Sequence, residues 1–427
     1  MSLKLKETID LIKNNTYNKQ TLKLVKFIKN NKYHSFIRPE EIKNLYPSLL
    51  EALKTNTTIT TLNLGYCGDK IYNVIQNNIN LLAEVIKTNK HIKSLDLSLN
   101  CLYDINPILE VLKKNNTLTS LDISYNIDIV FKDDNLLIDV LKTNKTLTSL
   151  SLFSIKFKNI NSFLEALKTN TTITSLGLDV YDNNINLLTE VLKVNTSLIS
   201  LDLLVHDYID IKPLADILKK NSTLQKLNLQ NSELNDFKPF AEALKVNKSI
   251  TSLNLSYIGD DFNVKNFDLL FEALKVNNTL KKINFEYTYI MDDYIKELAE
   301  VLKVNKGLTS LNLSHIGTFD LSLITEALKV NTTLKELNVS SNEFDDTELF
   351  GEVLKVNSTL NKLDLHENFF EDITLFLDGL KENTSLTELN LSGCHIKNIE
   401  TISKEIMKNK PNLKIIKDYD NKNEEQE

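Results

Sequence analysis

The feature that most constrains this chain is a motif, Leu-Lys-x-Asn or a close variant, that occurs thirteen times. Most copies continue with an apolar residue, two polar residues, Leu, a polar residue and Leu. Most neighbouring asparagines lie 26 residues apart, one pair lies 25 apart, and the longer steps are 28, 29, 30 and 33. A period in this range indicates a solenoid, in which each unit completes its core by stacking on its neighbours. The asparagines are Asn56, Asn89, Asn115, Asn144, Asn170, Asn195, Asn221, Asn247, Asn277, Asn305, Asn331, Asn357 and Asn383.

The first half of each unit has the pattern of a helix. Leu82, Val85 and Ile86 lie at positions i, i+3 and i+4, which share one helix face. Asn89 follows the last turn, and asparagine tolerates the left-handed conformation that often ends a helix. We therefore expect each helix to end at its motif asparagine, with that residue in the left-handed conformation.

The second half of each unit has the pattern of a short strand. Ile92, Leu95 and Leu97 alternate with polar residues at the end of the unit. A strand, a helix and a further strand within about 26 residues predict parallel pairing, because parallel strands need a crossover connection. The crossover is expected to be right-handed. The predicted fold class is therefore α/β, a right-handed solenoid with a parallel sheet.

The pattern Ile92-x-x-Leu95-x-Leu97-x-x-Asn100-x-Leu102 resembles a leucine-rich repeat. The preceding helix and its Leu-Lys-x-Asn ending resemble the ribonuclease-inhibitor-like class of that family. The resemblance implies a horseshoe with the parallel sheet on the concave side and helices on the convex side. It also implies binding to other proteins, usually through the concave surface, without naming a partner.

The repeat divides the chain into three segments. We expect a helical N-terminal cap over residues 1–48, about thirteen leucine-rich repeats over residues 49–409, and a C-terminal cap strand with an acidic tail over residues 410–427. Terminal repeats of a solenoid need a covered or polar end, which is the reason for predicting caps.

The family's asparagine ladder, five residues after the first strand leucine, is only partly present. Asn100, Asn126, Asn342 and Asn368 match it, and Cys67 and Cys394 are accepted substitutes. Buried main-chain groups need other partners where the ladder is interrupted. The interrupting residues are Ile155, Tyr181, His206, Ser232, Ile258, Thr288 and Ile316.

Charge and composition exclude some classes of function. The net charge is −7, with +6 in residues 1–50 and −13 in the remainder, so the acidic bulk disfavours a nucleic-acid partner. No run of 18 apolar residues predicts a membrane span, and the charged start lacks the apolar core of a signal peptide. The three cysteines form no even set or CxxC motif. We expect a monomeric cytoplasmic protein, located in the host cytoplasm if it comes from an intracellular pathogen.

No motif for catalysis is present. The chain contains no HExxH, GxSxG, P-loop or glycine-rich dinucleotide motif, and its nine glycines make phosphate-binding loops improbable. We therefore predict a non-catalytic scaffold for protein–protein interaction, without cofactor or metal. The alternative, by analogy with the repeat class, is a regulator of a small GTPase or of a cytoskeletal protein.

The candidate partner-binding residues interrupt a row of small polar side chains on the concave strand positions. Phe153, Val180, Tyr181, Leu204, Val205 and His206 lie at or just past these positions, and Tyr257 and Tyr287 extend the set. Adjacent strands bring equivalent residues to about 4.8 Å, so these side chains predict one apolar patch. Such patches mark interaction sites. The alternative is that the same residues fill space left by the interrupted ladder.

Overall fold

The computed structural model confirms the alternation of helices and short parallel strands. It describes residues 2–16, 19, 21–23, 39–65, 74–126, 129–131, 135–234, 236–258, 265–288, 290, 292–317, 320–370, 373–396 and 399–417. Contacts divide the chain into two compact units, residues 1–202 (unit 1) and residues 203–427 (unit 2). Within the described residues, no helix combines the length and the apolar character that crossing a membrane requires.

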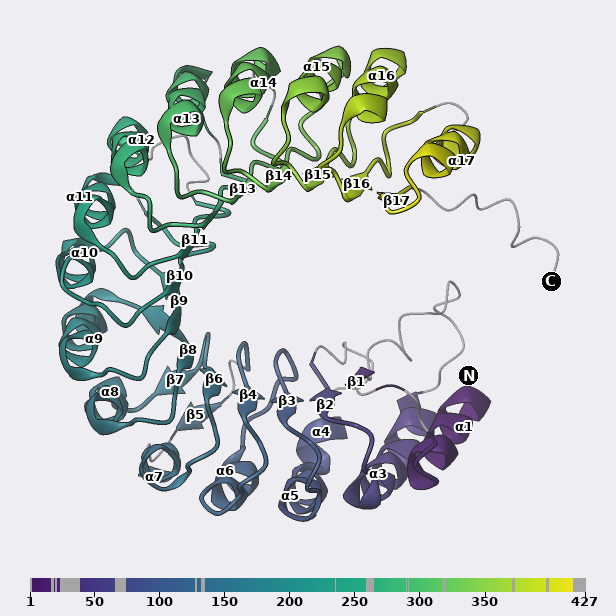
Figure 1. Cartoon of the computed structure of the whole chain (residues 1–427). Helices are drawn as coiled ribbons and strands as arrows, with labels where there is room; N and C mark the ends of the chain where they lie inside the picture. Colours follow the sequence, from purple (N-terminus) through teal and green to yellow (C-terminus); the bar gives the residue numbers. More distant parts are fainter. Residues whose placement is uncertain are drawn as a thin grey trace. The chain divides into compact units, whose positions relative to one another are not determined.

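Unit 1 alternates helices and strands along the chain (Figure 1). Strands β1, β2, β3, β4, β6 and β8 pair in this order, all parallel, and β5 pairs separately with β7. The elements are α1 (Ser2–Lys13), β1 (Thr21–Lys23), α3 (Pro39–Thr55), β2 (Thr61–Asn63), α4 (Val74–Asn77), α5 (Ile79–Thr88), β3 (Ser94–Asp96), α6 (Asn106–Leu112), β4 (Ser120–Asp122), β5 (Val130–Phe131), α7 (Asn135–Thr143), β6 (Ser149–Ser151), β7 (Lys156–Phe157), α8 (Ile160–Thr169), β8 (Ser175–Val180), α9 (Asp182–Val194) and β9 (Ser200–Val205), and the last contains the boundary between the units.

Unit 2 repeats the same arrangement, with β10 to β17 pairing in sequence order, all parallel. Its elements are α10 (Lys212–Leu218), β10 (Lys226–Asn228), α11 (Lys238–Val246), β11 (Ser252–Asn254), α12 (Phe267–Val276), β12 (Lys282–Asn284), α13 (Asp292–Val304), β13 (Ser310–Asn312), α14 (Leu321–Val330), β14 (Glu336–Asn338), α15 (Glu348–Val356), β15 (Lys362–Asp364), α16 (Thr374–Glu382), β16 (Glu388–Asn390), α17 (Ile399–Asn409) and β17 (Lys414–Ile416).

The core of each unit lies between its sheet and its helices, which cover one face of the sheet (Figure 1). Leu82, Val85 and Ile86 of α5 are at most 2% exposed, and Leu95 and Leu97 are fully buried, as the repeat pattern predicts. Each such leucine contributes about 1.5–3 kcal/mol to folding. The sheet face that points away from the helices is called the open face below.

The predicted segment boundaries differ from the structural elements. The boundary after residue 48 falls inside α3 (Pro39–Thr55), and β1 already pairs with β2, so the sheet begins before residue 49. The predicted final strand is present as β17 (Lys414–Ile416). The acidic tail, residues 418–427, lies outside the described residues, as does Cys67.

Most motif asparagines end their helices, whereas α6 and α10 end earlier, at Lys113 and Lys219, and the predicted left-handed conformation is wrong. Asn89 has φ −70° and ψ 131°, an extended conformation, and Asn247 and Asn331 are similar. The Asn89 side chain donates to the main-chain oxygens of Leu53 and Asn56, one repeat earlier, at 2.6 and 2.8 Å. Its Oδ1 accepts from the main-chain N–H groups two and three residues later. Asparagine is required because its side chain ties consecutive repeats together.

The asparagine ladder is present at the predicted positions that the structure describes. The Asn126 side chain donates to Leu97 O at 2.9 Å and accepts from the main-chain N–H groups of Asn100 and Leu102 at 3.0 Å. Cys394 Sγ donates to Leu365 O at 3.0 Å, which confirms cysteine as a substitute.

Two positions that the sequence assigned to the interrupted ladder carry hydroxyl groups that take over part of its role. Ser232 Oγ donates to Leu203 O at 3.1 Å, and Thr288 Oγ1 donates to Leu255 O at 2.6 Å. These hydroxyls satisfy main-chain carbonyls that would otherwise be buried without a partner.

Helices α15 and α16 approach unusually closely at two glycines. A Cβ atom on Gly379 would lie 2.0 Å from the main-chain oxygen of Gly351, and a Cβ on Gly351 would lie 2.5 Å from Leu375 O. The other repeats have alanine, valine or, once, isoleucine (Ile217) at the Gly379 position. The loss of that side chain therefore lets the two helix backbones touch.

Candidate protein-interaction surface

In most described repeats, one residue takes a left-handed conformation where the strand ends and the ladder position begins, whereas β8 and β9 continue as strands up to Val180 and Val205. The structure gives φ values of 52° to 69° for Leu99, Tyr125, Ser154, Asn231, Tyr257, Tyr287, His315, Ser341, Glu367 and Gly393. The main-chain N–H of this residue donates to the neighbouring repeat, as Tyr257 does to Glu286 O at 2.8 Å. The conformation costs an L-residue other than glycine or asparagine about 1–2 kcal/mol. A large side chain at one of these positions therefore needs an explanation that offsets the cost of the left-handed conformation.

Three consecutive repeats of unit 2 place rings at this position, and we call them the aromatic row (Tyr257, Tyr287 and His315). The Tyr257 and Tyr287 rings stack with centroids 4.4 Å apart, and those of Tyr287 and His315 lie 4.0 Å apart and nearly parallel. Tyr287 Oη lies 3.1 Å from His315 Nε2, within hydrogen-bonding distance. The tyrosines are 38% and 44% exposed, and His315 is half-buried. The row is a rigid, partly exposed ridge.

Unit 1 carries a smaller aromatic pair on its open face. The rings of Tyr125 and Phe153 stack with centroids 6.1 Å apart. Phe153 is half-buried because its ring lies over Gly177, where a Cβ atom would come within 2.9 Å of the ring. Tyr125 is 41% exposed. Glycine at residue 177 therefore makes room for the Phe153 ring.

The residues predicted for the partner-binding patch divide between the two units. Phe153, Val180 and Tyr181 lie in unit 1, and Leu204, Val205, His206, Tyr257 and Tyr287 lie in unit 2. Phe153, Leu204 and His206 are half-buried, and Tyr181 is 39% exposed at the N-terminal cap of α9.

Val180 and Val205 are fully buried, so the structure corrects their assignment to a surface patch. They end β8 and β9, which are six residues long where most strands have three. Because side chains alternate along a strand, both valines share the core side with the inward leucines. They fill space beneath the sheet, which is the packing alternative.

Sequence reasoning missed His315 and Tyr125, although a signal was available. Both residues immediately precede a ladder position, the same place that Tyr257 and Tyr287 occupy in their repeats. Aligning the residue before each ladder position would have placed all four rings at the same position of their repeats, Tyr125 in unit 1 and the other three in unit 2.

Electrostatics distinguish the open face of unit 1. Asp96 and Asp122 occupy paired positions on β3 and β4. Burial raises the pKa of the Asp122 carboxyl above its usual value, and the negative charge of Asp96 adds to this. Burial also raises the pKa of Tyr125, with further contributions from Asp179 and Asp122. The face therefore holds negative charge beside its aromatic pair.

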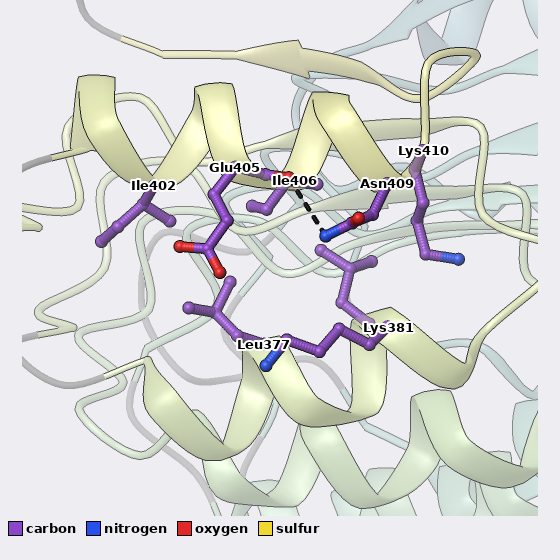
Figure 2. A pocket seen from close by; sticks show the side chains of 8 residues that line it. Leu377, Lys381, Ile402, Glu405, Ile406, Asn409 and Lys410 are labelled. Atoms are coloured by element: carbon purple, nitrogen blue, oxygen red, sulfur yellow. Dashed lines mark hydrogen bonds between the residues drawn. The ribbon is translucent and has the colours of Figure 1, made fainter.

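Unit 2 also contains a small pocket between α16 and α17 (Figure 2). Its volume is about 20 Å³, with apolar walls that include Leu377 and Ile402. Asn409 Nδ2 donates to the main-chain oxygen of Glu405 at 3.4 Å beside it. This volume holds little more than one water molecule, so the pocket is too small for an organic ligand.

The comparisons with known proteins support the repeat assignment. The family model described as leucine rich repeat matches residues 88–104, 114–126, 330–347 and 382–399. No significant match was found among curated protein sequences. The ribonuclease-inhibitor-like class stays a prediction from the sequence.

Several solved structures are similar to this chain. The chain in the Rad7 and Elc1 complex of yeast is 17% identical, with a TM-score of 0.47, 86% of this chain covered and 90% of that chain. The internalin inlF from Listeria monocytogenes is 18% identical, with a TM-score of 0.37 and coverages of 90% and 94%. The chain in the TLR13–ssRNA13 complex is 18% identical, with a TM-score of 0.45 and 84% of this chain covered. This chain spans 50% of the length of that TLR13 chain.

The strand–helix units, their parallel pairing and the four matches agree with one another. The chain carries leucine-rich repeats at the four matched places and folds as an α/β solenoid of strand–helix repeats.

Proposed function

We propose that this protein is a non-catalytic scaffold that binds a protein partner on its open sheet face, with the aromatic row of unit 2 as an anchor. The observation that carries the proposal is that Tyr257, Tyr287 and His315 are all held in the left-handed conformation and remain partly exposed. Aromatic side chains are favoured anchors in protein interfaces. Rings that are already stacked lose little conformational freedom on binding.

The fold itself does not require rings at these positions. The equivalent residues in other repeats of unit 2 are Asn231, Ser341, Glu367 and Gly393, none of which is aromatic, and asparagine and glycine adopt this backbone conformation readily. Strained residues that a fold retains without need are candidates for a functional role. The rings are therefore better explained by contact with a partner than by packing.

A row of asparagines lies beside the aromatic row on the open face. Oδ1 of Asn254, Asn284 and Asn312 accepts the main-chain N–H two residues later at 2.9–3.0 Å. This fixes each side chain and leaves its NH₂ group as a donor, which in Asn254 lies 3.4 Å from Gln230 Oε1. A partner polypeptide offers carbonyl oxygens that such donors can bind.

The test is affinity capture with the full chain as bait. The variant Tyr257→Asn/Tyr287→Asn/His315→Asn removes the rings and inserts a residue that accepts the left-handed conformation. The matched control is Val276→Asn/Val304→Asn/Val330→Asn, which changes three exposed residues at the helix ends of unit 2, 49–58% exposed. We expect proteins captured by the wild type and the control to be lost with the ring variant.

Circular dichroism and thermal unfolding verify that both triple variants are folded. Identical sets of captured proteins from the wild type, the ring variant and the control would contradict the role of the aromatic row.

A further inference from the structure

We propose that the open face of unit 1 binds an extended, basic segment of a partner protein, whose arginine or lysine side chains meet Asp96 and Asp122 and lie against the exposed apolar side chains beside them. This inference rests on the proposed function and names the chemical class of the partner.

The negative charge at Asp96 and Asp122 is not required by the fold. Asp96 Oδ1 accepts the Ser98 N–H at 3.0 Å, and Asp122 Oδ1 accepts the Ser124 N–H at 2.9 Å. The remaining donors to Asp96 are uncharged, namely Ser98 Oγ and Asn63 Nδ2, each at 2.7 Å. In unit 2, Asn254 occupies the same strand position and accepts the N–H two residues later at 3.0 Å. An uncharged amide oxygen therefore makes the same turn.

Keeping the charge at Asp122 costs stability. Asp96 and Asp122 face each other in the register of two adjacent parallel strands. Among the salt bridges between described residues, none involves either carboxylate. Burial disfavours the charged form of Asp122 and raises its pKa, and the charge of Asp96 raises it further. Like charges on adjacent strands repel, so an external cation would relieve both carboxylates.

One basic residue, Lys23, ends the edge strand β1, two strands away from Asp96, and the strands that follow it are neutral or acidic. Within the described strands β2, β3, β4, β6 and β8 there is no lysine or arginine. Asp179, on β8, accepts the main-chain N–H of Ser154 at 2.8 Å and adds further negative charge near Tyr125. Complementary charge therefore selects a basic partner, and the same field repels nucleic acid.

Apolar side chains adjoin the acids. Leu99 is 48% exposed and Tyr125 is 41% exposed, and Phe153 stacks on Tyr125. The aliphatic stems of lysine and arginine cover apolar surface while their charged ends reach carboxylates. A guanidinium over a tyrosine ring gains a cation–π contact as well. Acid and ring together suit a basic side chain better than either feature alone.

A metal ion is a poor occupant of this face. Within the described residues no group of three or more His, Cys, Asp or Glu side chains is arranged to hold one. The acids follow successive strands, at about the 4.8 Å spacing of a sheet, which matches a partner chain that crosses the strands.

The test titrates a fluorescein-labelled peptide of alternating arginine and serine with the full chain at low ionic strength. Binding is measured as the rise in the fluorescence anisotropy of the peptide. We expect Asp96→Asn/Asp122→Asn to weaken binding about tenfold, because two close charge pairs are lost. The matched control, Glu84→Gln/Glu110→Gln, removes the same charge from the helix side of unit 1, where these acids pair with Lys87 and Lys113. It should leave the affinity within about twofold of the wild type.

Three results would overturn the inference. They are equal affinity of the Asp96→Asn/Asp122→Asn variant and the wild type, equal weakening by the helix-side control, and equally tight binding of a glutamate–serine peptide or a single-stranded RNA.

The aromatic-row variant separates this inference from the proposed function. It should bind the basic peptide as the wild type does, since its substitutions lie in unit 2. Loss of captured proteins with that variant, combined with unchanged peptide binding by Asp96→Asn/Asp122→Asn, would refute the inference about unit 1 alone. The reverse pattern would refute the aromatic anchor alone.

Discussion

The side-chain amide of Asn305 donates a hydrogen bond of 2.6 Å to the main-chain oxygen of Leu274, one repeat earlier. It also donates to Asn277 O at 2.8 Å, while its Oδ1 accepts the main-chain N–H groups of Gly307 and Leu308. Asn305 is 3% exposed. One buried side chain therefore satisfies main-chain groups from two successive repeats.

Replacing Asn305 with alanine should be strongly destabilising. The change leaves buried carbonyl and N–H groups without partners, at a cost of about 1–3 kcal/mol for each group that water does not reach. Chemical denaturation should show a loss of several kcal/mol, on the order of 3 kcal/mol. The neighbouring exposed Lys306→Ala should stay within about 0.5 kcal/mol of the wild type. A similarly small effect of Asn305→Ala would mean that these bonds contribute little.

Gly379→Ala should destabilise unit 2, although alanine normally favours a helix over glycine by up to about 1 kcal/mol. The new methyl group would meet the main-chain oxygen of Gly351, so α15 and α16 must separate. Overpacking of this kind costs about 1–3 kcal/mol, measurable as a lower urea midpoint. Leu375→Ala, at an exposed position of the same helix, is the control. An unchanged or higher midpoint for Gly379→Ala would show that the helices separate at no cost.

Asp122→Asn should stabilise the protein at neutral pH and have no such effect in acid. Because burial raises the folded-state pKa of Asp122, its favourable contribution is present below its ordinary pKa. That contribution is lost as pH rises through the raised value, whereas asparagine stays uncharged throughout. Relief of the repulsion from Asp96 is worth roughly 0.2–1 kcal/mol. Thermal unfolding at pH 7 and near pH 3 should show the gain only at pH 7.

The same substitution at an exposed helix residue, Asp139→Asn, provides the comparison and should give no gain at pH 7. Destabilisation by Asp122→Asn at neutral pH would show instead that the charge supports the fold.

Tyr287→Asn should change stability little while removing the centre of the aromatic row. Loss of two ring stacks costs about 0.5–1.5 kcal/mol each. Relief of the left-handed strain returns about 1–2 kcal/mol, since asparagine adopts this conformation readily. Buried Phe285→Ala, in the same repeat, should cost about 3–5 kcal/mol. If Tyr287→Asn lowers the melting temperature as much as Phe285→Ala does, the ring belongs to the core rather than to an interface.

Gly177 and Phe153 should show strong coupling in a double-mutant cycle. Gly177→Ala places a methyl group against the Phe153 ring and should destabilise unit 1. In a Phe153→Ala background the same change has room, so its cost should fall by about 0.5–3 kcal/mol. Additive effects would show that the ring moves aside freely.

Sequence reasoning located the repeat, the inward leucines and the part of the ladder that ends in Asn126 and Cys394. These features depend on local spacing, which fixes the side of a helix or strand that a residue faces. Sequence reasoning predicted a left-handed Asn89, whereas the residue is extended. An asparagine that ends a helix can adopt the left-handed conformation or bond to the preceding repeat, and only the contact with Leu53 O shows that the second applies.

The sequence also did not predict that the side chains at the ends of β8 and β9 are buried. Val180 and Val205 became core residues because β8 and β9 continue past the usual three residues, and strand length depends on pairing with neighbours. The spacing of the motifs does not report that pairing.

By itself, the order of amino acids determined the repeat, because a period of about 26 residues that combines a helix pattern with a strand pattern indicates stacked strand–helix pairs. Tertiary contacts decided which side chains each repeat presents on its surface. The stacked rings, the two touching glycines and the opposed carboxylates of Asp96 and Asp122 arise between residues of different repeats. Their energies depend on distances that no single repeat encodes, so they became visible only when the repeats were placed side by side.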